Sequence, residues 1–239
     1  MEKKNIDYEI EDMIMGRPHG FSVEGERFFL YPLSLGKLYL LQRLYEQLEI
    51  NTQYLQLDIS YEAIRLAKLK RSACIQIIAY SSCKDKEEVF DTTNNRLKIQ
   101  FLDKNLSEED IVTLMIIILS SDKTSLALKH LGIEKEQERI KQINRIKNAN
   151  DKNTITTGGI SVYGTLIDAA CERYGWTKDY VVWGIDYASL RLMLADKINT
   201  IYITDEERKK MPASLMVGDG DTLKATKENM EAIKKMDWR

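Results

Sequence analysis

The chain has few of the residues on which catalysis, disulfide bonding and sharp turns depend. Its 239 residues include two histidines, three cysteines and three prolines. An odd number of cysteines without a C-x-x-C pair is a poor disulfide framework, which favours free thiols in a reducing compartment. Because prolines are rare and glycines number only 12, long helices are favoured over many short strands and turns. The sequence therefore predicts a mostly α-helical protein.

Long apolar runs and an excess of one charge are also missing. The densest apolar segment, residues 111–119, falls far short of the roughly 20 residues that cross a bilayer, so we expect a buried helix and no membrane contact. The first residues lack the apolar stretch of a signal peptide, which predicts a cytoplasmic protein. The 35 basic and 37 acidic residues leave a formal charge of −2. That balance creates no global attraction to nucleic acid.

The local patterns predict helices and one hairpin. β-formers on both sides of Glu24-Gly25 predict a small β-hairpin over residues 21–31. We expect the segment 1–20 to be a loose arm and the segment 84–104 to be irregular. The apolar helix near the middle of the chain should be buried on nearly all sides. The predicted helices of this half run over 35–49, 60–82, 108–119 and 123–132.

The polar segment 148–159 predicts a domain boundary. It contains almost no apolar residues and ends in two glycines, which is typical of a flexible linker. The predicted domains are an N-terminal helical bundle with the hairpin, residues 1–147, and a smaller C-terminal helical domain, residues 160–239. In the second domain, Ser161 and Thr177 are expected to cap the two helices of a helical hairpin. A final amphipathic helix is expected after residue 221.

Candidates for catalysis and metal binding are weak. His19 lies in a predicted loop and His130 near a helix C-terminus, where the helix dipole favours a cation, and neither has an evident catalytic partner. Asp219 and Asp221 lack the remaining oxygen ligands of a calcium loop. Gly158-Gly159 is not followed by the Lys-Ser or Lys-Thr of a phosphate-binding loop. We therefore expect no catalytic residues, no cofactor, no metal site and no enzymatic activity.

Basic residues alternate with acidic ones over residues 134–147. Such a segment is either a nucleic-acid-binding face or a solvated helix with ion pairs along it. The interspersed glutamates favour the solvated helix, so nucleic acid is not an expected partner. The residues concerned are Lys135, Arg139, Lys141, Arg145 and Lys147, with Glu134, Glu136 and Glu138 between them.

Tyrosine and tryptophan are concentrated in the C-terminal half. Six of them fall between residues 163 and 187. Most should belong to the core, but these residue types also anchor protein interfaces, because they bury a large area at low entropic cost. The residues that we predict to contact a partner protein are Tyr180, Trp183, Tyr187, Ile140 and Ile143.

Two segments resemble known phage proteins. The first begins at Tyr163-Gly164-Thr165-Leu166-Ile167-Asp168, passes through Tyr174-Gly175-Trp176-Thr177 and Trp183-Gly184-Ile185, and ends with Leu190 to Asp196. It resembles the helical hairpin of tail assembly proteins from bacteriophages and prophages, and its Tyr-Gly-Trp-Thr junction is the most specific part. The second, Phe21 to Leu41, includes Tyr31-Pro32-Leu33-Ser34 and is similar to the start of tail assembly chaperones from Bacteroides-type prophages. Together they cover roughly a third of the chain.

This resemblance implies a non-enzymatic helper in the cytoplasm of a bacterial host. Such a chaperone binds the tape measure protein, keeps its hydrophobic helices soluble, helps tail tube subunits gather on it, and is missing from the finished virion. Two other functions stay open. The chain could be a virion structural protein, such as a head–tail connector or tail completion factor, or a nucleic-acid-binding regulator. A homo-oligomer stays open as well.

Overall fold

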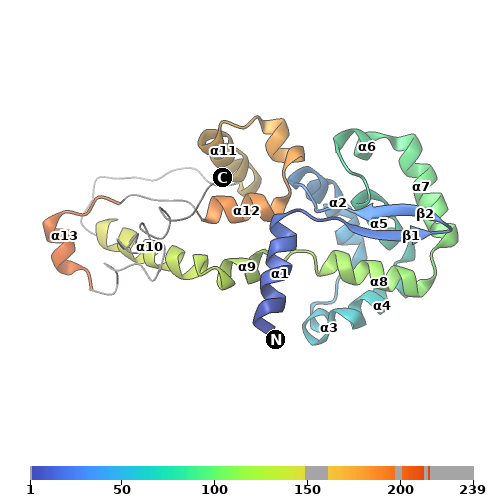
Figure 1. The fold of residues 1–239 in the computed structure, drawn as a ribbon, viewed down its shortest axis with the longest axis horizontal. Coiled ribbons are helices and arrows are strands. Elements are labelled where there is room, and N and C mark those ends of the chain that lie inside the picture. Colours follow the sequence, from blue (N-terminus) through green and yellow to red (C-terminus); the bar gives the residue numbers. More distant parts are fainter. Residues whose placement is uncertain (1, 149–160, 197–200, 213–214, 216–239) are drawn as a thin grey trace, which may run out of the picture. The chain divides into compact units, whose positions relative to one another are not determined.

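The computed structural model describes residues 2–148, 161–196, 201–212 and 215 (Figure 1). Within these residues it contains thirteen α-helices, one π-helical turn and one two-stranded sheet. The predicted mostly α-helical class with a minor hairpin is therefore confirmed. The predicted linker 148–159, apart from its first residue, and the predicted last helix lie outside the described residues.

The chain forms two compact units whose bounds differ from the predicted domains. Unit 1 contains residues 1–128 and 158–197, and unit 2 contains residues 129–157 and 198–239. The predicted division at 148–159 stays a prediction, although the described helices that directly follow this segment belong to the same unit as the N-terminal part of the chain. Neighbouring segments in sequence need not share a unit, and here the residues on the two sides of the predicted boundary are grouped by contacts far apart in the sequence.

The hairpin of unit 1 pairs β1 (His19–Val23) with β2 (Glu26–Leu30) in antiparallel register, with Val23 opposite Glu26. The turn residues Glu24 and Gly25 have φ angles of 48° and 82°. Positive φ at both central positions matches the right-handed twist of a two-residue hairpin, which explains the glycine. Val23 and Leu30 are buried against the helices.

One helix precedes this hairpin in the chain, and three helices follow it. The segment predicted to be a loose arm instead forms α1 (Glu2–Ile14). Ser34 caps α2 (Leu35–Leu48), as predicted, and accepts from the Lys37 N–H at 3.4 Å. A short helix, α3 (Thr52–Leu57), then leads into α4 (Ile59–Leu69).

Two further sequence predictions are corrected. The single helix expected over 60–82 is two helices, because the chain breaks at Lys70 before α5 (Arg71–Ser81). The segment expected to be irregular forms α6 (Lys86–Phe90) and α7 (Thr92–Asn105). Asp85 and Asp91 cap these two helices, and acceptor caps of this kind stabilise helices that bury few apolar residues.

The most apolar helix, α8 (Glu108–Leu119), begins at a capping box formed by Ser107 and Asp110. Its fully buried residues are Ile111, Leu114, Met115 and Ile118. Three other apolar residues of this helix, Val112, Ile116 and Ile117, are only half-buried. The helix is therefore buried on fewer sides than the sequence predicted. No single described helix is long and apolar enough to cross a bilayer. Together, α8 and α9 (Thr124–His130) pass that test of length and composition, with a 43° bend between them.

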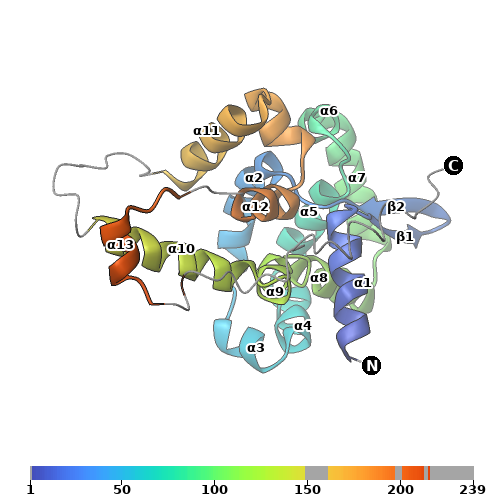
Figure 2. The same cartoon turned by 60° about the vertical axis from the view of Figure 1, so that its left-hand side comes forward.

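The remaining elements of unit 1 are α11 (Val162–Tyr174), the π-helical turn η1 (Tyr180–Gly184) and α12 (Tyr187–Ala195) (Figures 1 and 2). Ser161 caps α11, as predicted. A small apolar cluster of Ala170, Val181 and Leu190 joins these three elements.

Unit 2 is described through α10 (Ile133–Asn148) and α13 (Asp205–Lys210). Arg139 donates to the Leu215 carbonyl at 2.9 Å, and Lys147 donates to the Tyr202 carbonyl at 2.6 Å. The predicted capping box of Thr204 and Glu207 is present. These bonds connect α10 with the segment that follows residue 200.

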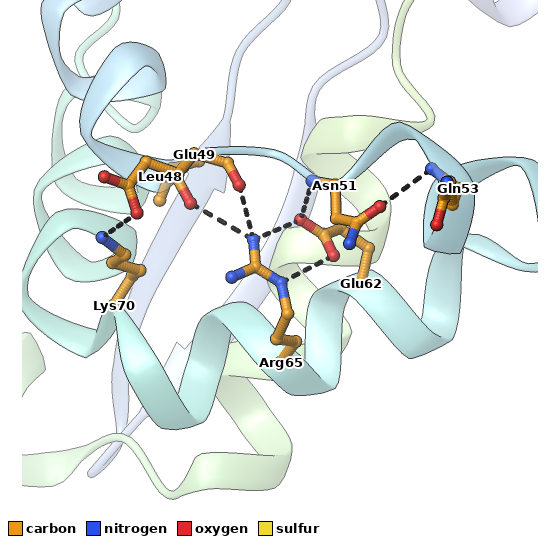
Figure 3. A network of polar contacts seen from close by, with 7 residues as sticks. All are labelled: Leu48, Glu49, Asn51, Gln53, Glu62, Arg65 and Lys70. Carbon is orange, nitrogen blue, oxygen red and sulfur yellow. Dashed lines mark hydrogen bonds and ion pairs between the residues drawn. The ribbon is translucent and has the colours of Figure 1, made fainter.

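A buried ion pair joins α2, α3 and α4 (Figure 3). The Glu62 side chain is fully buried and forms two hydrogen bonds with the Arg65 guanidinium, at 2.7 and 2.9 Å. Glu62 also accepts from the Asn51 N–H at 2.8 Å. Arg65 in turn donates to the carbonyls of Leu48 and Glu49. The pair therefore supplies partners for the backbone groups between α2 and α3, and the hydrogen bonds from Arg65 lower the pKa of Glu62.

Replacing Glu62 with Gln should destabilise the protein in a pH-dependent way. We expect a loss of about 1.5–3 kcal/mol at neutral pH, because hydrogen bonds to a charged partner are lost. The lowered pKa of Glu62 means that its contribution is present above the ordinary value of 4.5 and is lost as the pH falls through the folded-state pKa. Urea unfolding of both proteins between pH 7 and pH 3 should show the difference in unfolding free energy shrinking with falling pH.

The matched control is Glu49→Gln. Glu49 pairs with Lys70 at 2.8 Å, but its side chain is exposed, so its removal should have a much smaller effect. A difference between wild type and Glu62→Gln that stays constant over the whole pH range would contradict a role of the Glu62 charge in stability.

Candidate functional site

The starts of α2 and α12 meet in unit 1. Ser34 caps the first helix and Asp186 caps the second, where it accepts from the Ser189 N–H at 2.8 Å. These two cap residues form an antiparallel β-bridge. The Tyr187 N–H also donates to the Leu33 carbonyl at 2.8 Å. The two segments that carry the phage resemblance are thus joined by backbone hydrogen bonds.

A tryptophan packs against the backbone of α2 beside this junction. A Cβ atom added to Gly36 would lie 2.8 Å from three atoms of the Trp183 ring, which is closer than non-bonded carbon atoms approach. The Phe90 ring meets Trp183 edge-on, with 5.5 Å between the ring centroids. Glycine is therefore needed at residue 36 for close approach, since Trp183 occupies the space of a side chain.

An apolar cleft of about 380 Å³ opens beside the same junction. This volume lies within the roughly 300–1,000 Å³ of typical ligand sites. The cleft is formed by α1, the hairpin, α2, the end of α8 and the start of α12. Its apolar lining consists of Met13, Leu30, Tyr31, Pro32, Leu33, Leu38, Ile117, Ile118, Tyr187 and Ala188. The lining includes residues 30–33 and 38 of the second resembling segment, and residues 186–188, which lie between two quoted motifs of the first.

Charged side chains surround the cleft. Asp12 pairs with Arg17 at 3.1 Å, and Asp122 lies 3.8 Å from Arg191. The Arg191 guanidinium also lies 5.5 Å from the centre of the Tyr187 ring. An apolar floor with a paired, charged rim is the usual arrangement of a surface that accepts apolar side chains from a partner protein.

The predicted partner-binding aromatics lie in different environments. Tyr187 lines the cleft. Tyr180 is 44% exposed and meets Trp176 edge-on, with 5.1 Å between the centroids. Trp183 is held between Gly36 and Phe90. Tyr187 and Tyr180 are therefore accessible to a partner, whereas the position of Trp183 is that of a packing residue.

The predicted isoleucines belong to unit 2. Ile143 is buried and Ile140 is half-buried, both on α10. Several basic residues of this helix have acidic or carbonyl partners: Arg139 pairs with Glu136, Lys141 lies 3.7 Å from Glu138, and Lys147 bonds to a carbonyl. This pairing agrees with a solvated helix that carries ion pairs.

Sequence reasoning missed a buried lysine–cysteine cluster. Lys37 donates to the carbonyls of Cys83 and Lys84, and burial lowers its pKa. The Cys83 sulfur lies 3.2 Å from Asn95 Oδ1 and 3.5 Å from Lys98 Nζ. Burial raises the pKa of this thiol, which keeps it protonated and a poor nucleophile. The cluster connects α2 with the end of α5. No local sequence pattern predicts it, because its residues lie far apart in the sequence.

Among the described residues, no group of three or more His, Cys, Asp or Glu side chains is placed to hold a metal ion. His19 is one of the residues that line the cleft. Comparisons with protein-family models, curated proteins and solved structures give no match to this chain. The phage resemblance therefore stays a hypothesis that depends on the residues quoted above.

Replacing Gly36 with Ala should destabilise unit 1. The added methyl group would overlap the Trp183 ring, and overpacking of this kind costs about 1–3 kcal/mol. This loss should exceed the gain of up to about 1 kcal/mol that alanine brings to a helix. The same substitution in a Trp183→Leu background should be neutral or stabilising. The free energies of unfolding of the four proteins give the coupling between the two positions.

Gly164→Ala on α11 is the matched control. A Cβ atom there would only touch Ser161 at 3.5 Å, an ordinary contact, so stability should be unchanged or raised. Equal effects of Gly36→Ala with and without Trp183 would show that the tryptophan does not pack against α2.

Proposed function

We propose that this protein is a non-enzymatic tail assembly chaperone that binds helical segments of a tape measure protein in the cytoplasm of a bacterial host. The cleft beside the α2–α12 junction receives the apolar side chains of the client. One observation carries the proposal: the walls of this cleft come from residues 30–33 and 38, inside the second resembling segment, and from residues 186–188, which lie between two quoted motifs of the first. A role in gathering tail tube subunits belongs to the same proposal.

The chemistry of the cleft supports this function. Amphipathic client helices aggregate through their apolar stripes. A partner protein recognises such a helix when the apolar stripe of the helix packs into an apolar groove on the partner. The floor of the cleft is made of aliphatic and aromatic side chains, with Tyr187 at one wall. Tyrosine supplies a large contact area at low entropic cost, which makes it a common binding anchor.

The first experiment is co-expression with the tape measure protein of the same genome. The chaperone should raise the soluble yield of that protein, and the two should co-purify without added nucleotide or metal. Mass spectrometry of purified virions should not detect the chaperone. If it is a stoichiometric virion component, a structural role such as connector or completion factor replaces the proposal.

A cleft-filling variant tests the site. In Ala188→Phe, the larger side chain should occupy the cleft without removing a core contact, because Ala188 lines the cleft and is only half-buried. We expect client affinity to fall at least tenfold, which corresponds to about 1.4 kcal/mol. Tyr187→Ala should weaken binding by a similar or larger factor. Titration of a soluble client fragment gives the dissociation constants.

The matched control is Leu97→Phe. Leu97 lies on α7, is 58% exposed and does not line the cleft, so the enlarged side chain should leave affinity unchanged. Melting curves of all three variants separate lost binding from lost folding. A folded Ala188→Phe variant that binds the client as tightly as wild type would exclude the cleft as the client site.

A further inference from the structure

A second cavity, which the proposed function does not use, lies between α2, α5 and the end of α6. Its volume is about 390 Å³, which falls within the roughly 300–1,000 Å³ of typical ligand sites. We call it the α2–α5 pocket. It shares no lining residue with the cleft described above. Two cations, Lys37 and Arg43, line it together with two glutamines and a threonine. Its six apolar lining residues are Leu40, Leu41, Leu44, Tyr80, Val89 and Phe90.

Lys37 brings a buried cation to this pocket. The residue is only 4% exposed, and its ammonium group donates to the carbonyls of Cys83 and Lys84. The face of the Tyr31 ring lies 5.6 Å from the same nitrogen. An ammonium group has three N–H donors, so one donor has no hydrogen-bond acceptor among the described residues. Burial lowers the pKa of Lys37, which agrees with a charge that the protein compensates poorly.

The acidic side chains near the pocket are held by other groups. Asp85, Glu88 and Asp91 each accept from a backbone N–H at or just before the start of α6 or α7. Glu46 accepts from a glutamine side chain one turn earlier on α2. The charges of Asp85 and Glu88 raise the pKa of Lys37, but the opposing effect of burial is larger. None of these four acids lines the pocket, so its described lining has two positive charges and no carboxylate.

The exposed part of the lining is mostly apolar. Leu40 is 43% exposed and Phe90 is 56% exposed, and both belong to the pocket. Arg43 is also exposed and lies three residues after Leu40 on α2. Exposed apolar side chains around a buried cation are complementary to an amphipathic anion, because its apolar body can cover Leu40 and Phe90 while its charged head reaches Lys37.

We propose that the α2–α5 pocket binds a small carboxylic acid with an apolar body, of the chemical class of the fatty acids. The carboxylate accepts the remaining N–H of Lys37. One free donor suits a carboxylate better than a phosphate, whose three oxygens need more donors. The pocket is larger than any single amino-acid side chain, which favours a free small molecule over an acidic side chain of a partner protein. This inference does not rest on the proposed chaperone function.

Titrations with octanoate and 1-octanol, followed by two-dimensional NMR, test the pocket. The two probes have the same chain length and differ in the charge of the head. We expect octanoate to bind about tenfold more tightly, because only octanoate forms a hydrogen bond between two charged groups with Lys37. The shifted signals should belong to residues of α2, α5 and α6. In Lys37→Met, which keeps an apolar stem and removes the charge, the preference for octanoate should disappear.

The matched control is Lys104→Met. Lys104 is an exposed lysine of α7 that does not line the pocket, so octanoate affinity should equal that of wild type. If Lys37→Met does not fold, Arg43→Gln serves as a second variant. It removes an exposed charge and should weaken octanoate binding by a smaller factor, without changing 1-octanol binding.

Equal affinities of wild type for octanoate and 1-octanol would overturn the proposal. So would a folded Lys37→Met variant that keeps the preference, or shifts confined to residues of the other cleft. If octanoate does not bind and Lys37→Met instead weakens binding of the tape measure protein, the pocket accepts an acidic side chain of a client and the proposal is wrong.

Discussion

The close contact between Trp183 and the backbone at Gly36 is the constraint on which the arrangement of unit 1 depends. It brings the π-helical turn η1 onto the first turn of α2. The β-bridge between Ser34 and Asp186 lies beside it and fixes the direction of both helices. Because the two helix starts are held together, the residues that follow each cap come to line one cleft. A side chain at residue 36 would separate the elements that form the cleft.

Capping and turn patterns predicted a large share of the fold. Ser34, Ser107 and Thr204 cap the helices expected of them, and Glu24-Gly25 forms the expected turn. These signals are local, because a cap or a two-residue turn bonds within a few residues of itself. Helices α6 and α7 were not predicted, because their segment has little apolar periodicity. Their cap residues, Asp85 and Asp91, were the remaining local signal.

The candidate site was predictable only in part. Tyr187 was expected to contact a partner, and it lines the cleft. Trp183 was expected there too, but its partner Gly36 lies far away in sequence, and a single chain gives no sign of such pairs. The grouping of α11 and α12 with the N-terminal part of the chain was not predicted, for the same reason. A polar, glycine-containing segment indicates a break in local structure, whereas the packing of α11 and α12 with the N-terminal part is decided by long-range contacts.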